Sequence, residues 1–208
     1  MKLIFISGPS GSGKTTLSKQ IIGKIKNGHI LNTDNYYRIG ILSKLLSKFV
    51  KGYFDRSISF NYKLFNKDFN FIIKNGISIY ARSYNFEKKT INNSLKETSN
   101  INYLIIEGIF AKEFSSTLYN QNYFFLELKI NKNECKKRVV QRDLKERGKE
   151  KKQAEEDFLK SWDIYYEKFN NKKIKKMQPN SLLQKKLILI KYLTNYLDEF
   201  LIFLLKLK

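Results

Sequence analysis

A run of small residues, "GPSGSGKTT" at positions 8–16, has the composition and spacing of a loop that binds phosphate. It fits the pattern G-x-x-x-x-G-K-[ST] at every fixed position. Glycines let such a loop turn its N–H groups toward a phosphate, and the start of the next helix adds more free N–H groups. Lys14 then supplies a point charge to the β- and γ-phosphates, and Thr15 supplies a hydroxyl to Mg²⁺. The sequence therefore predicts a nucleoside triphosphate site formed by Gly8, Pro9, Ser10, Gly11, Ser12, Gly13, Lys14, Thr15 and Thr16.

Carboxylates follow two other apolar runs. Asp34 comes after "HILNT", and a kinase that acts on a hydroxyl benefits from a carboxylate that accepts the proton. A helix cap or turn is an equal alternative for Asp34. Glu107 ends "INYLIIE", where it is expected to face a polar site, directly or through Mg²⁺-bound water. The alternative for Glu107 is an ion pair with a surface lysine.

The stretch "RVVQRDLKERGK" carries arginines that suit phosphate binding. Arg138 and Arg142 share a helical face, and Arg147 precedes a helix-breaking glycine. Arginines on a lid at about residues 142–153 would close over the phosphates and exclude water. An exposed basic helix remains the alternative in so basic a chain.

Strands and helices alternate along the chain. Apolar runs predict strands at residues 2–7, 29–34, 101–108 and 123–130. Helical spacing follows the first glycine loop and recurs at 39–51, 61–76, from about 133, and from 154 onward. The stretch 77–86 reads as extended and 88–100 as a polar loop. This order is typical of a mostly parallel sheet with helices on both faces, where ligands lie at the carboxyl ends of the strands.

These pieces, in this order, resemble the uridine kinase and phosphoribulokinase family of P-loop kinases, and uridine kinases most of all. "GPSGSGKTT" is similar to the family's phosphate loop, and "TDNYY" to its Q-D-x-F-Y segment. "YFDRSISFN" is similar to F-D-x-P-x-A-F-D, "YNF" to Y-D-F, and "IIEGIFA" to E-G-I-L-A. "RDLKERG" is similar to the lid motif R-D-x-x-x-R-G. The resemblance covers roughly residues 2–169 and implies an α/β P-loop NTPase fold, a three-layer sandwich with an Arg-rich lid.

The resemblance also implies the reaction and the roles of individual residues. It implies transfer of the γ-phosphate of ATP or GTP, with Mg²⁺, to the 5′-hydroxyl of uridine or cytidine. Asp34 would be the catalytic base, with Lys14, Arg142 and Arg147 acting on the phosphates. The metal would be bound by Thr15 and Glu107. The residues implied at the acceptor are Tyr37, Asp55, Tyr84, Phe86 and Arg138.

The sequence departs from the family pattern around the acceptor. Lys89 stands where uridine kinases usually have His, Ser57 replaces the Pro of F-D-x-P, and Asp157 falls where a Gln is expected. Two other functions therefore stay open. One is a kinase for another small alcohol, such as another nucleoside, pantothenate or a sugar phosphate. The other is a P-loop ATPase associated with nucleic acid.

The length and composition of the chain limit the number of domains and the kinds of partner that we expect. The 208 residues suit one domain, with a helical segment expected at about 181–208. The net charge of +21 is spread along the chain, which favours a solvated basic surface over a specific nucleic-acid site. Cys135 is the single cysteine, so no internal disulfide forms, as is typical of a cytoplasmic protein. The apolar run "FLIFLLKLK" is far shorter than the ~20 residues of a membrane span. We expect no membrane partner, and homo-oligomerisation stays open.

Overall fold

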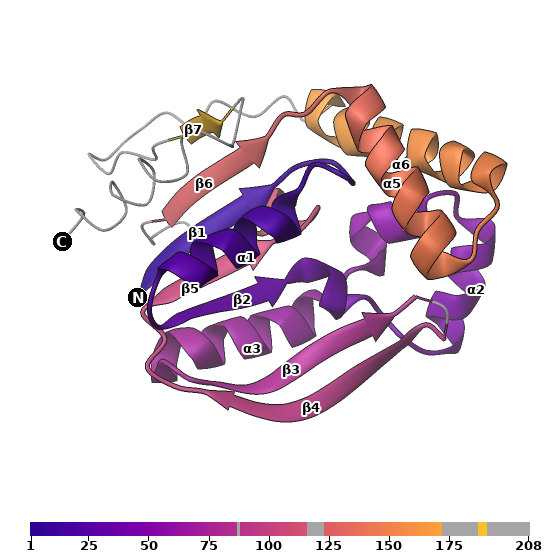
Figure 1. Cartoon of the computed structure of the whole chain (residues 1–208). Coiled ribbons are helices and arrows are strands. Elements are labelled where there is room, and N and C mark those ends of the chain that lie inside the picture. The colour runs from indigo at the N-terminus through magenta and orange to yellow at the C-terminus, as the bar shows by residue number, and fades with distance from the viewer. Residues whose placement is uncertain (87, 116–122, 172–186, 191–208) are drawn as a thin grey trace.

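The computed structural model describes residues 1–86, 88–115, 123–171 and 187–190, and Figure 1 shows their arrangement. Its strands are β1 Lys2–Ser7, β2 Gly28–Asn32, β3 Ser78–Asn85, β4 Thr90–Thr98, β5 Tyr103–Glu107, β6 Tyr123–Leu128 and β7 Leu187–Ile190. Its α-helices are α1 Lys14–Lys24, α2 Ile41–Phe49, α3 Tyr62–Asn75, α4 Ala111–Ser115, α5 Lys132–Arg147 and α6 Lys151–Asn171. Short 3₁₀ turns are η1 Thr33–Tyr36, η2 Tyr53–Asp55 and η3 Ser57–Ser59.

A five-stranded sheet in the order β2-β5-β1-β6-β7 forms the centre of the fold, and all its neighbouring strands are parallel. Four of the five residues of β5 are buried without alternation, as expected for a strand that is covered on both faces. The register sets Glu107 of β5 beside Ile6 of β1 and Asn32 of β2. The carboxyl ends of three neighbouring strands are therefore level, and the segments that follow them meet at one edge.

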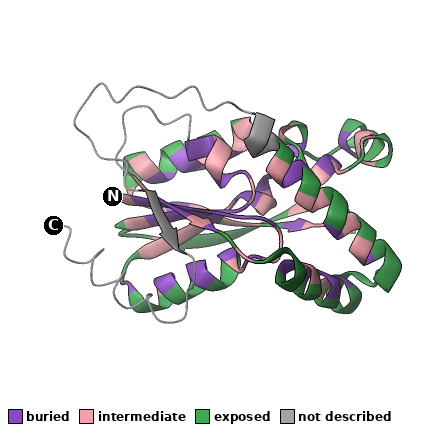
Figure 2. Cartoon of the chain, turned by 90° about the horizontal axis from the view of Figure 1, so that it is seen from above, coloured by how far each residue is buried: buried purple, intermediate pink, exposed green. Residues whose placement is uncertain are grey.

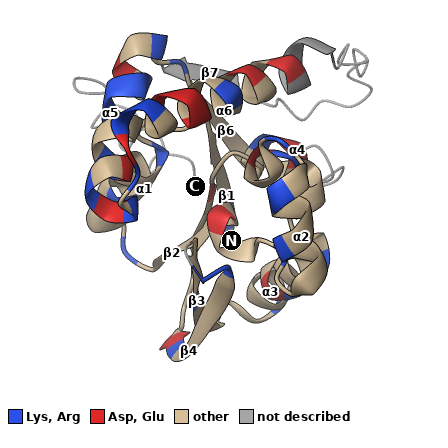
Figure 3. Ribbon diagram, turned by 90° about the vertical axis from the view of Figure 1, so that its right-hand side faces the viewer, with Lys and Arg blue, Asp and Glu red and all other residues tan. Residues whose placement is uncertain are grey.

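Helices cover each face of the sheet with a separate apolar core. On one face, Ile21 of α1 packs with Ile4 of β1. On the other face, Phe65 of α3 and Phe114 of α4 lie ring to ring at 4.5 Å and pack with Phe5. Figure 3 shows the sheet between α1 and α3, and Figure 2 shows buried strands between half-exposed helices. The α/β three-layer sandwich predicted from the sequence is confirmed.

Two long helices lie beyond the carboxyl edge of the sheet (Figure 1). They pack on each other through Cys135, Val139 and Phe158. Between them, Gly148 ends α5 with φ +60°, and α6 begins at Lys151. The predicted lid, about residues 142–153, thus corresponds to the end of α5, a short turn and the start of α6.

The prediction of a polar loop at 88–100 is wrong. Residues Thr90–Thr98 form β4, which pairs antiparallel with β3. The side chains of β4 are mostly exposed, so the strand lacks the apolar alternation that sequence reasoning uses. Backbone pairing with β3 makes it a strand.

The helical segment predicted at about 181–208 is corrected in part. Residues Leu187–Ile190 form β7, which pairs in parallel with β6 at the edge of the sheet. An open edge strand offers unpaired backbone groups, and a short apolar segment satisfies them by pairing there. The rest of 181–208 lies outside the described residues.

Within the described residues, no helix is long and apolar enough to span a membrane.

Candidate active site

The phosphate loop, residues 8–15, joins the carboxyl end of β1 to the start of α1. Gly11 has φ +79°, and a Cβ at this position would lie 2.6 Å from the carbonyl oxygen of Cys135 in α5. Gly13 has φ +89° and directly precedes α1. Such left-handed backbone angles favour glycine, so the shape of the loop explains why glycines occupy these positions. The close approach at Gly11 also joins the loop to the helix that leads into the lid.

Lys14 is folded back over the phosphate loop. Its side chain is buried, and Nζ donates a hydrogen bond of 3.0 Å to the carbonyl oxygen of Pro9. Burial lowers the pKa of Lys14, while the negative charges of Asp34 and Glu107 raise it. The buried Oγ of Ser12, in the same loop, has no hydrogen-bond partner among the described residues. Buried polar atoms are rarely orphaned, so this atom fits a site that is completed by a phosphate oxygen.

Glu107 is the buried carboxylate at the centre of the site. It is 1% exposed, and its Oε1 accepts hydrogen bonds from Thr15 Oγ1 at 2.9 Å and from Asn32 Nδ2 at 2.6 Å. Burial and the neighbouring charge of Asp34 together raise the pKa of Glu107 to about 7, against the effect of Lys14 and of the two hydrogen bonds. The partners that fix Glu107 are thus neutral groups of the site, rather than a surface lysine.

The same residues fit a magnesium site. The described residues hold no group of three or more His, Cys, Asp or Glu side chains placed to bind a metal. Mg²⁺ does not need such a cage, because it keeps several waters and takes one or two protein ligands together with phosphate oxygens. The hydroxyl of Thr15 and the carboxylate of Glu107, at hydrogen-bond distance from each other beside the phosphate loop, are the side chains that would hold it.

Asp34 lies next to the phosphate loop, and it is not the cap of its own turn. It lies in η1, where Asn32 is the cap and accepts a 2.7 Å hydrogen bond from the Asp34 backbone N–H. The buried Oδ1 of Asp34 has no hydrogen-bond partner in the part of the chain that the structure describes. Burial raises the pKa of Asp34, while Lys14, Arg142 and Arg147 lower it. The carboxylate therefore lies within reach of charges from both the phosphate loop and the lid.

One buried carboxylate anchors the cations of the lid. Asp143 is 2% exposed and accepts hydrogen bonds from Arg142 at 2.9 and 3.0 Å. Arg147 NH1 lies 3.4 Å from the same oxygen, and Lys149 Nζ lies 3.0 Å from the other oxygen. Burial opposes ionisation of Asp143, but these three cations lower its pKa. Three positive charges on one carboxylate leave an excess of positive charge, which suits a lid that binds phosphates.

An aromatic cluster lies beside the lid. Tyr37, Tyr84 and Phe86 pack edge to face, with ring centroids 5.0 to 5.6 Å apart. Phe54 and Phe110 pack against Tyr37 at 5.1 and 6.1 Å. The buried hydroxyl of Tyr84 has no hydrogen-bond partner among the described residues. The cluster thus combines apolar faces with one unsatisfied polar group, as binding sites for planar ligands do.

Asp55 lies at the border of this cluster. Its Oδ1 accepts a 2.6 Å hydrogen bond from Ser161 of α6. Burial raises the pKa of Tyr37, and the charges of Asp34 and Asp55 raise it further. Tyr37 therefore lies within the field of both carboxylates, between the predicted base and the predicted acceptor ligand.

Arg138 and Arg147 go to different parts of the site. Arg138 NH1 lies 3.5 Å from the carbonyl oxygen of Gly11, so it belongs with the phosphate loop and not with the aromatic cluster. The guanidinium of Arg147 lies over the ring of Phe86, 4.5 Å from its centroid. Arg147 therefore contacts the lid and the predicted acceptor pocket at once.

The structure brings most of the predicted residues to one edge of the sheet. Gly8, Pro9 and Ser10 lie in the phosphate loop, and Thr16 is exposed on the first turn of α1. Sequence reasoning missed Asn32, Asp143 and the rings of Phe54 and Phe110. Asn32 ends β2 beside Glu107. Its position at the carboxyl end of a predicted strand is the feature of the sequence that could have identified it. The role of Asp143 depends on contacts across a helix turn that no motif specifies.

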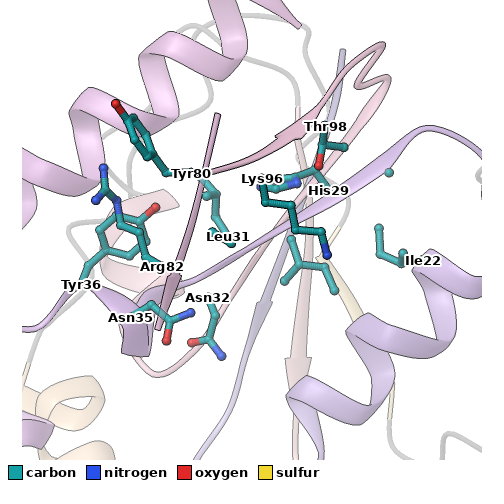
Figure 4. A pocket seen from close by; sticks show the side chains of 13 residues that line it. Ile22, His29, Leu31, Asn32, Asn35, Tyr36, Tyr80, Arg82, Lys96 and Thr98 are labelled. Atoms are coloured by element: carbon teal, nitrogen blue, oxygen red, sulfur yellow. The ribbon is translucent and has the colours of Figure 1, made fainter. Parts of the chain in front are cut away.

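A cavity of about 330 Å³ lies elsewhere, between the edge of β2 and the β3–β4 hairpin (Figure 4). Of the residues with orphaned buried atoms, none lines this cavity within the described chain. The guanidinium of Arg82, which lines the cavity, already donates hydrogen bonds to the side chains of Asp68 and Asn93. We therefore assign the chemistry to the edge with the phosphate loop, on the other side of Asn32.

Comparisons with known proteins agree with this geometry. A sequence model of the phosphoribulokinase / uridine kinase family matches residues 3–178. A uridine kinase of Ureaplasma parvum serovar 3 is 29% identical over 155 residues, 71% of each chain. A uridine kinase of Borrelia hermsii is 29% identical over 175 residues, 81% of this chain and 80% of that one.

A solved structure shows the same fold. The putative fructose transport system kinase of Silicibacter sp. superposes with a TM-score of 0.60 at 17% identity, over 79% of this chain and 84% of that one. The family match spans most of the chain, from β1 through the lid helices. The protein therefore belongs to the phosphoribulokinase / uridine kinase family of P-loop kinases.

Proposed function

We propose that this kinase transfers the γ-phosphate of ATP to a hydroxyl of a small molecule, and that the acceptor is the 5′-hydroxyl of uridine or cytidine. The observation that carries the proposal is the position of Asp34. Its buried, unpartnered Oδ1 faces the charges of Lys14 and the lid arginines. A buried carboxylate oxygen without a hydrogen-bond partner among the described residues, at the edge where phosphate would bind, supports the role of a general base.

Binding of the triphosphate is assigned to the phosphate loop and Lys14. The backbone N–H groups of the loop and of the first turn of α1 would surround the β- and γ-phosphates. The ammonium of Lys14 would leave the carbonyl oxygen of Pro9 for a phosphate oxygen, which is a stronger, charge-assisted partner. GTP fits the same contacts, since the loop reads only phosphates.

Mg²⁺, when bound, supplies positive charge to the transferring phosphoryl group. Thr15 would offer its hydroxyl to the metal, and Glu107 would hold a ligand water or the metal itself. The raised pKa of Glu107, about 7, favours a protonated carboxyl near neutral pH in the absence of metal. Loading of the site therefore requires release of that proton.

Proton transfer is assigned to Asp34. As the acceptor oxygen forms its bond to the γ-phosphorus, its proton passes to Oδ1 of Asp34, and the bond from phosphorus to the bridging oxygen of ADP breaks. Burial raises the pKa of Asp34, which favours uptake of a proton, and positive charge from Lys14, Arg142 and Arg147 opposes that rise. The same cations would stabilise the charge that moves onto the leaving ADP.

The acceptor site is assigned to the aromatic cluster. The faces of Tyr84 and Phe86 suit a planar base, and the free hydroxyl of Tyr84 suits one of its polar edges. Asp55, beside Tyr37, suits the ribose hydroxyls. The relatives named above as uridine kinases support this choice of acceptor.

A sugar or another small alcohol is the second candidate acceptor, and one contact favours it. Lys89, at the position where uridine kinases usually have His, is turned away to hydrogen-bond Ser47 of α2 at 2.7 Å. Its side chain is thus used to hold the β3–β4 hairpin to α2. A fold shared with a protein described as a putative fructose transport system kinase is compatible with this alternative.

A screen of acceptors tests the proposal. We would measure ADP release from ATP with uridine, cytidine, other nucleosides, pantothenate, sugars and sugar phosphates, each with and without Mg²⁺. Uridine or cytidine is expected to give the highest kcat/KM, with the 5′-monophosphate as product. Turnover confined to a sugar would select the second candidate. ATP hydrolysis that needs no acceptor and rises with added RNA would contradict both.

A further inference from the structure

The helix α2 is turned with its apolar side outward. Ile41 is 87% exposed, Phe49 76% and Leu42 68%, and Leu45 is half-exposed. The only buried residue of the helix is a polar one, Ser43. An amphipathic helix normally does the reverse, with its apolar stripe toward the core. Contiguous exposed apolar surface of this kind marks an interaction site.

Hydrogen bonds from separate elements fix this orientation. Ser43 Oγ donates to the carbonyl oxygen of Arg38 at 2.7 Å and accepts from the hydroxyl of Tyr53 in η2 at 3.1 Å. On the same side, Lys89 donates to Ser47 Oγ. Rolling the apolar side inward would break these bonds and leave the buried hydroxyl of Tyr53 without its partner. The outward apolar side is therefore a fixed surface of the fold.

Positive charge surrounds this surface, and negative charge is missing from it. Lys44 and Lys48 are exposed on α2, and Arg38 and Lys51 are exposed at its two ends. Residues 35–54 contain no Asp and no Glu. Figure 3 shows α2 at the outer edge of the molecule, on the opposite side of the sheet from α1. The partner must therefore accept apolar side chains and carry negative charge.

We propose that α2 is a contact site for an anionic lipid surface, which revises the expectation from the sequence that the protein has no membrane partner. A helix that exposes Ile, Leu and Phe with lysines along their border suits the plane of the headgroups, with its apolar side in the acyl boundary and its lysines at the phosphates. A second copy of the chain fits less well, because a two-fold contact would set these lysines against one another without a carboxylate from this stretch. The proposal concerns attachment to a surface and does not depend on the identity of the acceptor.

Vesicle sedimentation with the full chain tests the proposal. Binding is expected for phosphatidylcholine vesicles that contain phosphatidylglycerol and not for phosphatidylcholine alone. The pair Lys44→Glu/Lys48→Glu should weaken binding by roughly 30-fold or more, from about a fivefold loss per lysine removed near the surface. The pair Ile41→Ser/Phe49→Ser should weaken it at least tenfold. None of these four side chains belongs to the proposed catalytic machinery, so turnover in solution should be unchanged.

Matched controls separate this site from the general charge of the protein. Lys63 and Lys67 are exposed on α3 with the same spacing, so Lys63→Glu/Lys67→Glu makes the same change in net charge. Leu95→Ser removes another exposed apolar side chain, on β4. Both controls should bind vesicles within about twofold of the parent protein.

Three results would overturn the proposal. The first is a loss of binding in the α3 pair as large as in the α2 pair, which would indicate the overall charge alone. The second is failure to bind any vesicle. The third is a dimer in sedimentation velocity that Ile41→Ser/Phe49→Ser dissociates without vesicle binding by the parent, which would assign the surface to a second copy.

Discussion

Asp34 separates a catalytic role from a structural one more clearly than any other residue of the site. Its Oδ1 is buried without a hydrogen-bond partner among the described residues, and Asn32 is the residue that caps its turn. Asparagine has nearly the same shape but cannot accept the proton. We expect Asp34→Asn to lower kcat by roughly a hundredfold or more, with the Kd for ATP nearly unchanged. The melting temperature should stay the same or rise, because a buried charge is removed.

The control for this variant is Asn32→Ala, which removes the cap and the hydrogen bond to Glu107. It should lower the melting temperature. If Asp34→Asn behaved in that way and kept its kcat, the carboxylate would be structural and the proposed base would be wrong.

The stability of the protein is expected to depend on pH through Glu107. Its pKa is raised to about 7 by burial, so the folded state holds a proton that the unfolded state releases above about pH 4.5. Stability from this group therefore falls as the pH rises from about 4.5 to about 7. Glu107→Gln keeps the acceptor for Thr15 and Asn32 without the charge. Its free energy of unfolding should exceed that of the parent by about 1 to 3 kcal/mol at pH 8, and the two should converge below about pH 4.

Activity should move in the opposite direction. Glu107→Gln should require at least tenfold more Mg²⁺ for half-maximal rate, because the ionised carboxylate is lost. Denaturant unfolding at the two pH values and a Mg²⁺ titration provide the measurements. A variant that is destabilised at pH 8 would show that the charge is compensated in the free protein.

At the scale of elements, we expect the proposed lid, about residues 142–153, to depend on Asp143. This carboxylate pairs with Arg142, Arg147 and Lys149, and its lowered pKa means that it stabilises the fold above about pH 4 and loses that effect in acid. Asp143→Asn should lower the free energy of unfolding at pH 7 by about 1 to 3 kcal/mol. Three cations without their anchor also repel one another, so we expect KM for ATP to rise more than fivefold.

The matched control is Asp157→Asn. Asp157 also pairs with Lys149, but it is 42% exposed, so its loss should cost less than about 1 kcal/mol and leave KM unchanged. Urea unfolding and initial rates distinguish the two variants. Equal changes in the unfolding free energy and in KM for both variants would indicate that the net charge of the lid matters, and not the buried position of Asp143.

At the scale of the whole molecule, the question is whether the charge of +21 has a nucleic-acid partner. Binding to a nucleic acid rests on counterion release and falls steeply with salt. The proposed chemistry lies in a partly buried site, where screening is weaker. Between 50 and 200 mM salt, we expect any RNA or DNA binding to drop by about 10³-fold or more and kinase activity to change less than about threefold. Tight, sequence-specific binding at 200 mM salt would contradict this.

The sequence alone determined four of the five described strands of the sheet, the phosphate loop and the positions of Asp34 and Glu107. Buried parallel strands are continuous apolar runs, and a loop that wraps a phosphate needs glycines at fixed places, so both leave a local signal. Because the carboxyl ends of parallel strands meet at one edge, chain order was enough to bring these residues together.

Only the tertiary structure decided the remainder. β4 exists because β3 pairs with its backbone, although its side chains are exposed and show no pattern. The anchor at Asp143 and the outward apolar side of α2 likewise depend on neighbours distant in the chain. The periodicity of apolar residues in the sequence indicates which side chains share a face of a helix or strand, but not which element packs against that face. Contacts between elements determine which faces pack together, and therefore which charges are buried and which apolar side chains are exposed.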